Sequence, residues 1–132
     1  MKLLAVDTEN TIFDIGNPFY EANRCCVVSY SGYCGSGVVD LEYSGTPYAA
    51  RLADLRALIH GADLVVGFNL KYDLHWLRRY GIHIGGPENP SQKVWCAQLY
   101  EYLASAQQHR LDSLEAAVSR RALGEKQKGI EA

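Results

Sequence analysis

The chain has 132 residues, a formal net charge of -2 and a hydrophobic content of 48%. This length and composition indicate one globular domain and exclude a long disordered chain, while the charge excludes a nucleic-acid binder that relies on an overall positive field. No apolar stretch approaches the roughly 20 residues of a membrane-spanning helix, so we expect a cytoplasmic protein with no membrane partner.

The first half of the chain predicts three strands. A short apolar run, Leu3 to Val6, ends in the polar residues 7–10. Two β-rich runs, Cys25 to Tyr30 and Gly37 to Tyr43, are joined by glycines and serines typical of a hairpin. We therefore expect these three strands to be antiparallel.

The second half of the chain predicts helices around one more strand. Leu64 to Phe68 is typical of a buried strand, and residues 81–91 are typical of a loop. Helical spacing of apolar residues predicts helices at residues 52–60 and 70–80, at Val94 to Ala104 and at Leu111 to Leu123. We expect an α/β domain over residues 1–124, in which three antiparallel strands and then a parallel strand form a mixed sheet flanked by helices, and a polar tail at residues 125–132.

Three carboxylates stand where predicted strands end. Asp7 and Glu9 are two residues apart, so in a strand they project from one face while Thr8 faces away, and Asp73 follows the fourth strand. Anions this close repel one another unless a cation lies between them, and Mg²⁺ or Mn²⁺ prefers such oxygen ligands. The pattern predicts a metal-dependent phosphoryl-transfer site; solvated loop charges or a helix cap are the alternative.

Other reactive or aromatic side chains have simpler interpretations. The four cysteines lack zinc-site spacing and are expected to be reduced, although a bridge at Cys34 is conceivable. The four histidines also lack ligand spacing. Trp95, Leu99, Tyr100 and Leu103 form a stripe at helical spacing, which predicts core residues.

Two strings carry a resemblance to a known family. V-D-T-E at residues 6–9 and G-F-N-L-K-Y-D at residues 67–73 resemble the first two motifs of DEDD-type 3′-5′ exonucleases, which have a ribonuclease H-like fold. The chain is most similar to the proofreading domain of family A DNA polymerases, including phage enzymes. The stretch from His109 to Asp112 is similar to a third landmark, and the resemblance extends from Leu3 to about Leu123.

The resemblance implies a reaction at two divalent ions, Mg²⁺ or Mn²⁺, which remove nucleotides from a single-stranded or frayed DNA 3′ end. Asp7 would bridge both ions. Glu9 would hold the ion that generates hydroxide, and Asp73 would serve the ion near the leaving group. A polymerase domain or protein is the implied partner, in the cytoplasm of a bacterial cell or a phage-infected host.

The same resemblance implies a set of substrate contacts. Asn69 and Tyr72 would contact the terminal sugar or phosphate, and Phe13 would be a wedge on which terminal bases stack. Thr8 and Asn10, beside the acidic pair, complete the expected substrate-binding set. Without the resemblance, Asn69 is interpreted as a helix N-cap and Phe13 as a turn or core aromatic.

One family feature does not occur in this sequence. Relatives carry a fourth carboxylate on a later helix, preceded four residues earlier by a tyrosine or five residues earlier by a histidine, and His109 and Asp112 do not match it. We therefore expect a domain that is truncated before this third motif and shows reduced or no activity alone. The alternatives are a catalytically deficient module that binds nucleic-acid 3′ ends, an RNA-trimming exonuclease of the same fold, and a purely structural domain.

Overall fold

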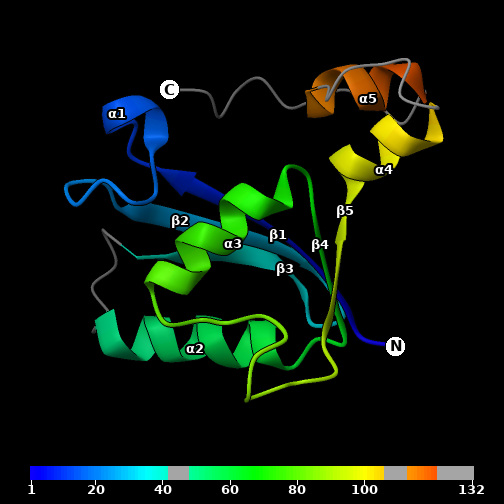
Figure 1. The fold of residues 1–132 in the computed structure, drawn as a ribbon. Coiled ribbons are helices and arrows are strands. Elements are labelled where there is room, and N and C mark those ends of the chain that lie inside the picture. Colours follow the sequence, from blue (N-terminus) through cyan, green and yellow to red (C-terminus); the bar gives the residue numbers. More distant parts are fainter. Residues whose placement is uncertain (42–47, 106–112, 122–132) are drawn as a thin grey trace.

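The computed structural model describes residues 1–41, 48–105 and 113–121, in which a five-stranded mixed sheet is flanked by helices (Figure 1). The strand order is β3-β2-β1-β4-β5. Strands β1 and β2 and strands β2 and β3 pair antiparallel, whereas β4 pairs parallel with both β1 and β5. The elements are β1 (Leu3–Asn10), α1 (Phe13–Gly16), β2 (Cys25–Gly32), β3 (Gly35–Asp40), α2 (Tyr48–His60), β4 (Leu64–Gly67), α3 (Leu70–Arg79), β5 (Lys93–Cys96), α4 (Ala97–Ala104) and α5 (Leu114–Arg120).

The mixed α/β architecture predicted from the sequence is confirmed. The three antiparallel strands, the parallel fourth strand and helices α2 and α3 lie close to their expected positions. Strand β1 is longer than predicted because its pairing with β2 continues from Leu4 to Asn10. Asp7 and Glu9 therefore lie within a strand rather than after it.

The predicted helix from Val94 to Ala104 is wrong over its first three residues. Lys93–Cys96 is strand β5, which pairs with β4 from Leu64 to Gly67. A short apolar run carries no periodicity that separates a strand from a helix, and pairing with β4 decided the outcome here. The helix begins only at Ala97.

The aromatic stripe on this segment is not core, contrary to the sequence-based prediction. Trp95, Leu99, Tyr100 and Leu103 are between 45% and 64% exposed. The physical reason is that β5 is an edge strand of the sheet and that α4 has no buried residue. The rings of Trp95 and Tyr100 contact each other, with centroids 5.3 Å apart.

The core lies on one face of the sheet, beneath α2 and α3. Alternation along β1 buries Leu4, Val6 and Thr8 on this face and exposes Asp7 and Glu9 on the other. Trp76 of α3 is completely buried, which makes it a core residue. The core cluster comprises side chains of β1, β2, β4, α2 and α3, among them Leu4, Val28, Val65, Leu55, Ile59, Leu70, Trp76 and Leu77.

The C-terminal predictions are only partly within the described chain. Helix α5 lies within the predicted range of Leu111 to Leu123. Residues His109 and Asp112, the domain boundary at residue 124 and the tail at 125–132 lie outside the described residues. None of the helices in the described ranges has the length and apolar character required to cross a membrane.

Candidate active site

Helix α3 begins where β4 ends, and this places its first turn against the last part of β1. The parallel register pairs Ala5 with Val66, so β1 continues beyond the last residue of β4, Gly67. The chain turns tightly here and brings Leu70 close to Gly67. A Cβ at Gly67 would lie 2.8 Å from Leu70 Cδ1, so glycine fits this position best. Asn69 is the N-cap in the left-handed region, at φ 56°, and its exposed side chain makes no capping hydrogen bond.

Asp73 lies against the edge of β1 that β4 leaves unpaired. Its Oδ1 accepts a hydrogen bond of 2.6 Å from Thr8 Oγ1 and another of 3.3 Å from the Thr8 backbone N–H. Asn10 Nδ2 donates to Thr8 Oγ1 over 2.9 Å, which extends the chain of hydrogen bonds along the strand. Only 3% of the Asp73 surface is exposed. The structure therefore brings Asp73 to the strand that carries Asp7 and Glu9.

The surroundings of Asp73 make its charge costly. Burial raises the pKa of Asp73 from its ordinary value of 3.8 to about 6. The hydrogen bond from the Thr8 hydroxyl opposes this rise, whereas the negative charges of Asp7 and Glu9 add to it. The three acidic groups are thus close enough to interact electrostatically, as expected of carboxylates that share one site.

Asp7 and Glu9 line a cleft of about 600 Å³ on the opposite face of β1 from the core. We call it the carboxylate cleft. Its walls come from β1, from the end of β4, and from the first residues of α4 and α5: Ala5, Val6, Asp7, Glu9, Val66, Gly67, Phe68, Ala97, Ser113, Leu114 and Glu115. Asp73 does not line this cleft, because it is buried against Thr8, whose side chain lies on the core face of β1.

The chemistry of these donors fits a hard divalent cation. The charged side chains that line the cleft are carboxylates, those of Asp7, Glu9 and Glu115. Within residues 1–41, 48–105 and 113–121, no three His, Cys, Asp or Glu side chains lie close enough together to hold one ion by themselves. Mg²⁺ does not require that, because it keeps several waters and commonly uses one or two carboxylates with substrate phosphates.

The loop between β1 and β2, residues 11–24, presents Phe13 to solvent. Phe13 is 60% exposed, in a short turn where Asp14 and Ile15 adopt φ 49° and φ 57°. Such left-handed conformations persist only where neighbouring contacts hold them. Buried Asn23 provides these contacts, because its Nδ2 donates to the carbonyls of Phe13 and Asn17 over 2.6 Å and 2.9 Å.

Helix α3 holds the same loop at two points. Tyr72 Oη donates a hydrogen bond of 2.7 Å to the carbonyl of Gly16. A Cβ at Gly16 would lie 2.8 Å from that hydroxyl, so the approach requires glycine. The Arg79 guanidinium donates to the carbonyls of Pro18, Tyr20 and Glu21. The hydroxyl of Tyr72 therefore stabilises the β1–β2 loop.

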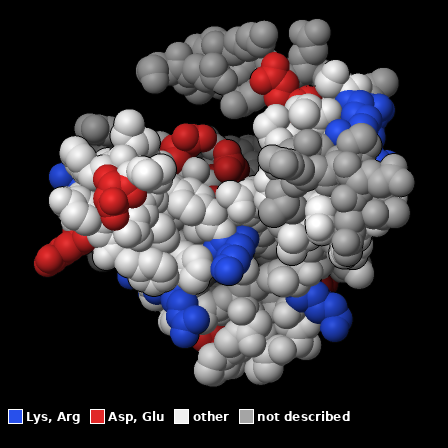
Figure 2. Space-filling view, turned by 45° about the horizontal axis from the view of Figure 1, so that its top comes forward, with Lys and Arg blue, Asp and Glu red and all other residues white. Residues whose placement is uncertain are grey.

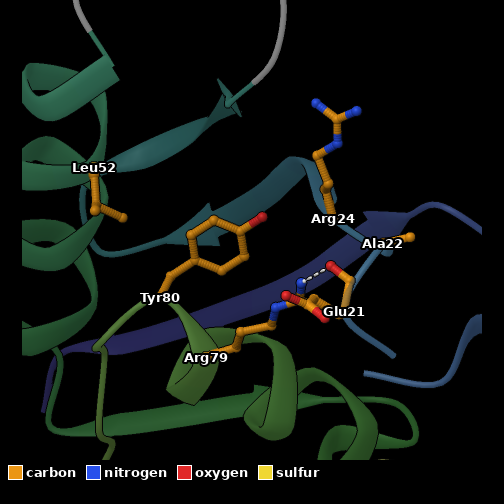
Figure 3. A pocket seen from close by; sticks show the side chains of 6 residues that line it. All are labelled: Glu21, Ala22, Arg24, Leu52, Arg79 and Tyr80. Atoms are coloured by element: carbon orange, nitrogen blue, oxygen red, sulfur yellow. Dashed lines mark hydrogen bonds between the residues drawn. The ribbon is translucent and has the colours of Figure 1, made fainter. Parts of the chain in front are cut away.

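A second cavity of about 670 Å³ lies at the C-terminal end of α3 (Figure 3). Arg79 of α3, Tyr80 just after it and Leu52 of α2 line it, while Glu21, Ala22 and Arg24 come from the β1–β2 loop. The hydrogen bond drawn in the figure joins Arg79 to the carbonyl of Glu21 at 2.8 Å. None of the predicted site residues lines this cavity, so it is not part of the candidate active site.

Charged side chains on the surface are grouped by sign. Figure 2 shows acidic side chains on the upper left and at the top of one face, and most Lys and Arg side chains lower down and on the right. Lys71 and Arg78 are exposed on α3. Any attraction for phosphate therefore comes from local groups, as the net charge of -2 indicated.

Two residues near the site were not found by sequence reasoning. Glu115, in the first turn of α5, lines the carboxylate cleft, and Asn23 holds the turn that carries Phe13. Asn23 stands in a loop-like stretch where asparagine is common, and no local pattern marks it as buried. Ser113 and Glu115 mark a helix start, but only packing brings that start to β1.

Comparisons with known proteins agree with this geometry. A family model described as 3′-5′ exonuclease, from family A DNA polymerases, matches residues 1–130. Among solved structures, the chain is similar in fold to a family B DNA polymerase from the hyperthermophilic archaeon Pyrobaculum calidifontis, with a TM-score of 0.67 and 13% sequence identity. The similarity covers 94% of this chain and 18% of that polymerase. No curated protein matches the sequence.

Proposed function

The chain belongs to the 3′-5′ exonuclease family, whose activity is hydrolytic, and on that premise we propose that it removes nucleotides from the 3′ end of single-stranded or frayed DNA. The observation that carries the proposal is the position of three carboxylates around one stretch of β1. Asp7 and Glu9 line a cleft, and Asp73 is hydrogen-bonded to Thr8 between them. Proofreading is the corresponding role beside a polymerase domain in the cytoplasm.

In this proposal Asp7, Glu9 and Asp73 are the catalytic carboxylates and hold Mg²⁺ or Mn²⁺, two ions in the complete site. The bound cations would supply charge stabilisation for phosphodiester cleavage. Thr8 and Asn10 act as positioning residues, because their hydrogen bonds connect the strand to Asp73. The burial of Thr8 favours this role over direct contact with DNA.

The 3′ end would lie between the β1–β2 loop and the start of α3. Phe13 presents an exposed ring on which a terminal base can stack. The side chain of Asn69 is exposed at the start of α3, within reach of a terminal sugar or phosphate. Tyr72 supports this arrangement by holding Gly16 in the loop that bears Phe13. In this proposal its ring also contacts the DNA 3′ end. Exposed Lys71 supplies attraction for phosphate.

We propose weak turnover for the isolated chain. No three ligating side chains meet at one point in the described ranges, so metal affinity depends on water and on substrate phosphates. This observation also favours the second candidate function, a module that binds DNA 3′ ends without cleaving them. An RNA-trimming activity uses the same geometry and is separated by substrate choice.

The test is a digestion of a 5′-labelled single-stranded DNA oligonucleotide with Mg²⁺ or Mn²⁺. A 3′-5′ exonuclease produces a ladder of shortened products, and EDTA abolishes it. The Asp7→Asn variant should lose the activity, which excludes a contaminating nuclease. Asp54→Asn is the matched control, because Asp54 is an exposed acid on α2 outside the carboxylate cleft.

Three outcomes separate the alternatives. Product release from DNA with an intact Asp54→Asn control supports the exonuclease proposal. Binding of a fluorescent 3′ end, measured by anisotropy, without any release supports the binding module instead. Faster release from a matched RNA oligonucleotide than from DNA supports the RNA-trimming enzyme. The absence of both binding and release overturns the proposed function.

A further inference from the structure

We infer that the groove between helix α3 and the β1–β2 loop is a second contact site for single-stranded DNA, which takes a nucleotide on the 5′ side of the terminal one. We call it the α3–loop groove. It has a volume of about 450 Å³ and is lined by Pro18, Phe19, Glu21, His75, Arg78 and Arg79. None of these residues belongs to the motif strings at residues 6–9 and 67–73. The inference rests on the proposed function, because it assigns the part of the site that holds the strand behind its 3′ end.

The first observation is that Phe19 is exposed although its backbone is held in place. Phe19 is 76% exposed. The carbonyls of its two neighbours, Pro18 and Tyr20, accept hydrogen bonds of 3.1 Å and 3.0 Å from Arg79 Nη1, and its own N–H donates to Asn17 Oδ1 over 2.9 Å. A backbone that is fixed in this way lowers the entropy cost of binding.

Phe19 is not the only apolar side chain that this loop presents to solvent. The β1–β2 loop also exposes Ile12, Phe13, Ile15 and Tyr20. Single exposed apolar residues are common on protein surfaces, but several on one loop are typical of an interaction surface. The loop is therefore expected to contact a ligand over more than one residue.

The second observation is the contact between Phe19 and His75 of α3. Their ring centroids lie 5.1 Å apart and their planes are inclined at 64°, which is an edge-to-face contact. This contact supports the exposed phenylalanine ring from the side of the helix. A nucleobase can stack on a ring that is exposed in this way, and such stacking tolerates any base. Ligand sites in proteins commonly have volumes of about 300–1,000 Å³, so the α3–loop groove has room for one nucleotide.

The third observation is the positive charge beside these rings. Lys71, His75 and Arg78 are four and three residues apart on α3, so they share one face of the helix, and both Lys71 and Arg78 are exposed. The Arg78 guanidinium makes no hydrogen bond or ion pair with the residues that the structure describes. Two arginines line the α3–loop groove, against the single carboxylate of Glu21. Cations beside exposed aromatic rings fit single-stranded nucleic acid, whose phosphates meet the cations and whose bases meet the rings.

The groove is continuous with the proposed site for the terminal base. The β1–β2 loop is bound to α3 at Tyr72, through the carbonyl of Gly16, and again at Arg79, two turns further along the helix. Phe13 comes before the first of these contacts and Phe19 lies at the second. Both exposed rings are thus presented by one loop that is fixed to one helix. A strand whose last base stacks on Phe13 therefore has a second ring along the same loop for a nucleotide behind it.

The first experiment measures binding of a fluorescent dodecanucleotide of thymidine to the whole chain by anisotropy, in EDTA to prevent cleavage. Further strands lack a single base, at the second, third, fourth or fifth position from the 3′ end. We expect one of these abasic positions to raise the Kd of the wild type by about tenfold, because a stacked base is lost. Phe19→Ala should raise the Kd of the intact strand by a similar factor and should not respond further to that abasic position. Phe13→Ala should still respond to it.

Arg78→Gln tests the phosphate contact. We expect the slope of log Kd against log salt concentration to decrease in magnitude by about 0.7, the value for one phosphate of a single strand. Lys93→Gln is the matched control, because it removes the same charge from an exposed position on β5 outside the groove. Val38→Ala removes an exposed apolar side chain from β3 and is the control for Phe19→Ala. Both controls should bind DNA as the wild type does.

The outcomes distinguish this inference from the proposed function. If Phe13→Ala weakens DNA binding and neither Phe19→Ala nor Arg78→Gln does, the proposed 3′-end site stands and the inference is overturned, as for a surface that contacts protein instead. If Arg78→Gln and Lys93→Gln change the salt slope equally, the effect is general electrostatics, and the inference is again overturned. If the wild type does not bind the strand, the proposed function fails and the inference fails with it. Unchanged thermal unfolding of Phe19→Ala and Arg78→Gln shows that the fold is intact.

Discussion

The hydroxyl of Thr8 donates a 2.6 Å hydrogen bond to Asp73 Oδ1, across 65 positions of sequence. The backbone N–H of Thr8 reaches the same oxygen at 3.3 Å. One residue of β1 thereby holds the acidic residue of α3, while its two neighbours in the strand, Asp7 and Glu9, face the carboxylate cleft. This contact joins the two halves of the candidate active site, and the first two predictions depend on it.

Replacement of Thr8 by valine should destabilise the protein. Valine keeps the shape of the side chain but leaves the buried Asp73 oxygen without its shortest hydrogen bond. We expect the free energy of unfolding at pH 7 to fall by about 1–3 kcal/mol, as for other unsatisfied buried acceptors. Urea denaturation measures the change. Thr8→Ser, which keeps the hydroxyl, should lose less stability. If Thr8→Val has the same free energy of unfolding as the wild type, this bond does not stabilise the fold.

The stability of the metal-free protein should fall as the pH rises from about 4 to 7. The folded-state pKa of Asp73, about 6, lies above its ordinary value of 3.8, so the folded chain binds a proton more tightly than the unfolded chain. The contribution of Asp73 to stability is therefore full below pH 3.8 and is lost as the pH rises through 6. The loss should not exceed about 3 kcal/mol.

Asp73→Asn isolates this effect. We expect the variant to lack the fall in stability over that pH range and to be more stable than the wild type at pH 7 in EDTA, because a buried charge has been removed. It should also lose metal-dependent release of nucleotides. Urea denaturation at several pH values checks the first point, with Asp54→Asn as the control. Equal pH slopes for wild type and Asp73→Asn would contradict the assignment.

Asn23→Ala should loosen the β1–β2 loop. The substitution removes the donor to the carbonyls of Phe13 and Asn17 and the acceptor for Thr11 Oγ1, all at a buried position. We expect a loss of about 2–4 kcal/mol in unfolding free energy and faster proteolytic cleavage within the loop. Asn17→Ala, at a less buried position of the same loop, should cost about 1 kcal/mol or less. Similar costs for both variants would show that Asn23 is not the main support.

Phe13→Ala should weaken substrate binding without affecting the fold. The ring is 60% exposed, so its removal should change unfolding free energy by no more than about 0.5 kcal/mol. Loss of base stacking should raise the Kd for a single-stranded 3′ end by about tenfold. Fluorescence anisotropy measures this affinity. Val38→Ala removes an exposed apolar side chain from β3 and should leave the Kd unchanged; equal effects of the two variants would exclude a stacking role for Phe13.

The acidic pair of β1, Asp7 and Glu9, shows which structural properties the local sequence can predict. The period of two in a strand predicted that Asp7 and Glu9 share a face and that Thr8 points away, and the burial pattern of β1 confirms it. Helical spacing likewise predicted the helix at residues 70–80, and the structure buries Trp76 and Leu77 on one face of it. The same spacing predicted that Trp95 and Tyr100 are core residues, and this prediction was wrong. Burial depends on which strand or helix packs against a side chain, and local spacing does not contain that information.

The sequence by itself determined the strands and helices that carry the motifs, the face that each acidic side chain of β1 occupies, and the resemblance to 3′-5′ exonucleases. These properties follow from the backbone repeat and from neighbouring residues, so a linear pattern contains them. Only the tertiary structure decided that Asp73 meets Thr8, that Asn23 supports the turn at Phe13, and that Glu115 lines the same cleft as Asp7 and Glu9. Contacts between residues far apart in sequence arise when whole elements pack to bury apolar surface, and no local period records which polar side chains that packing brings together.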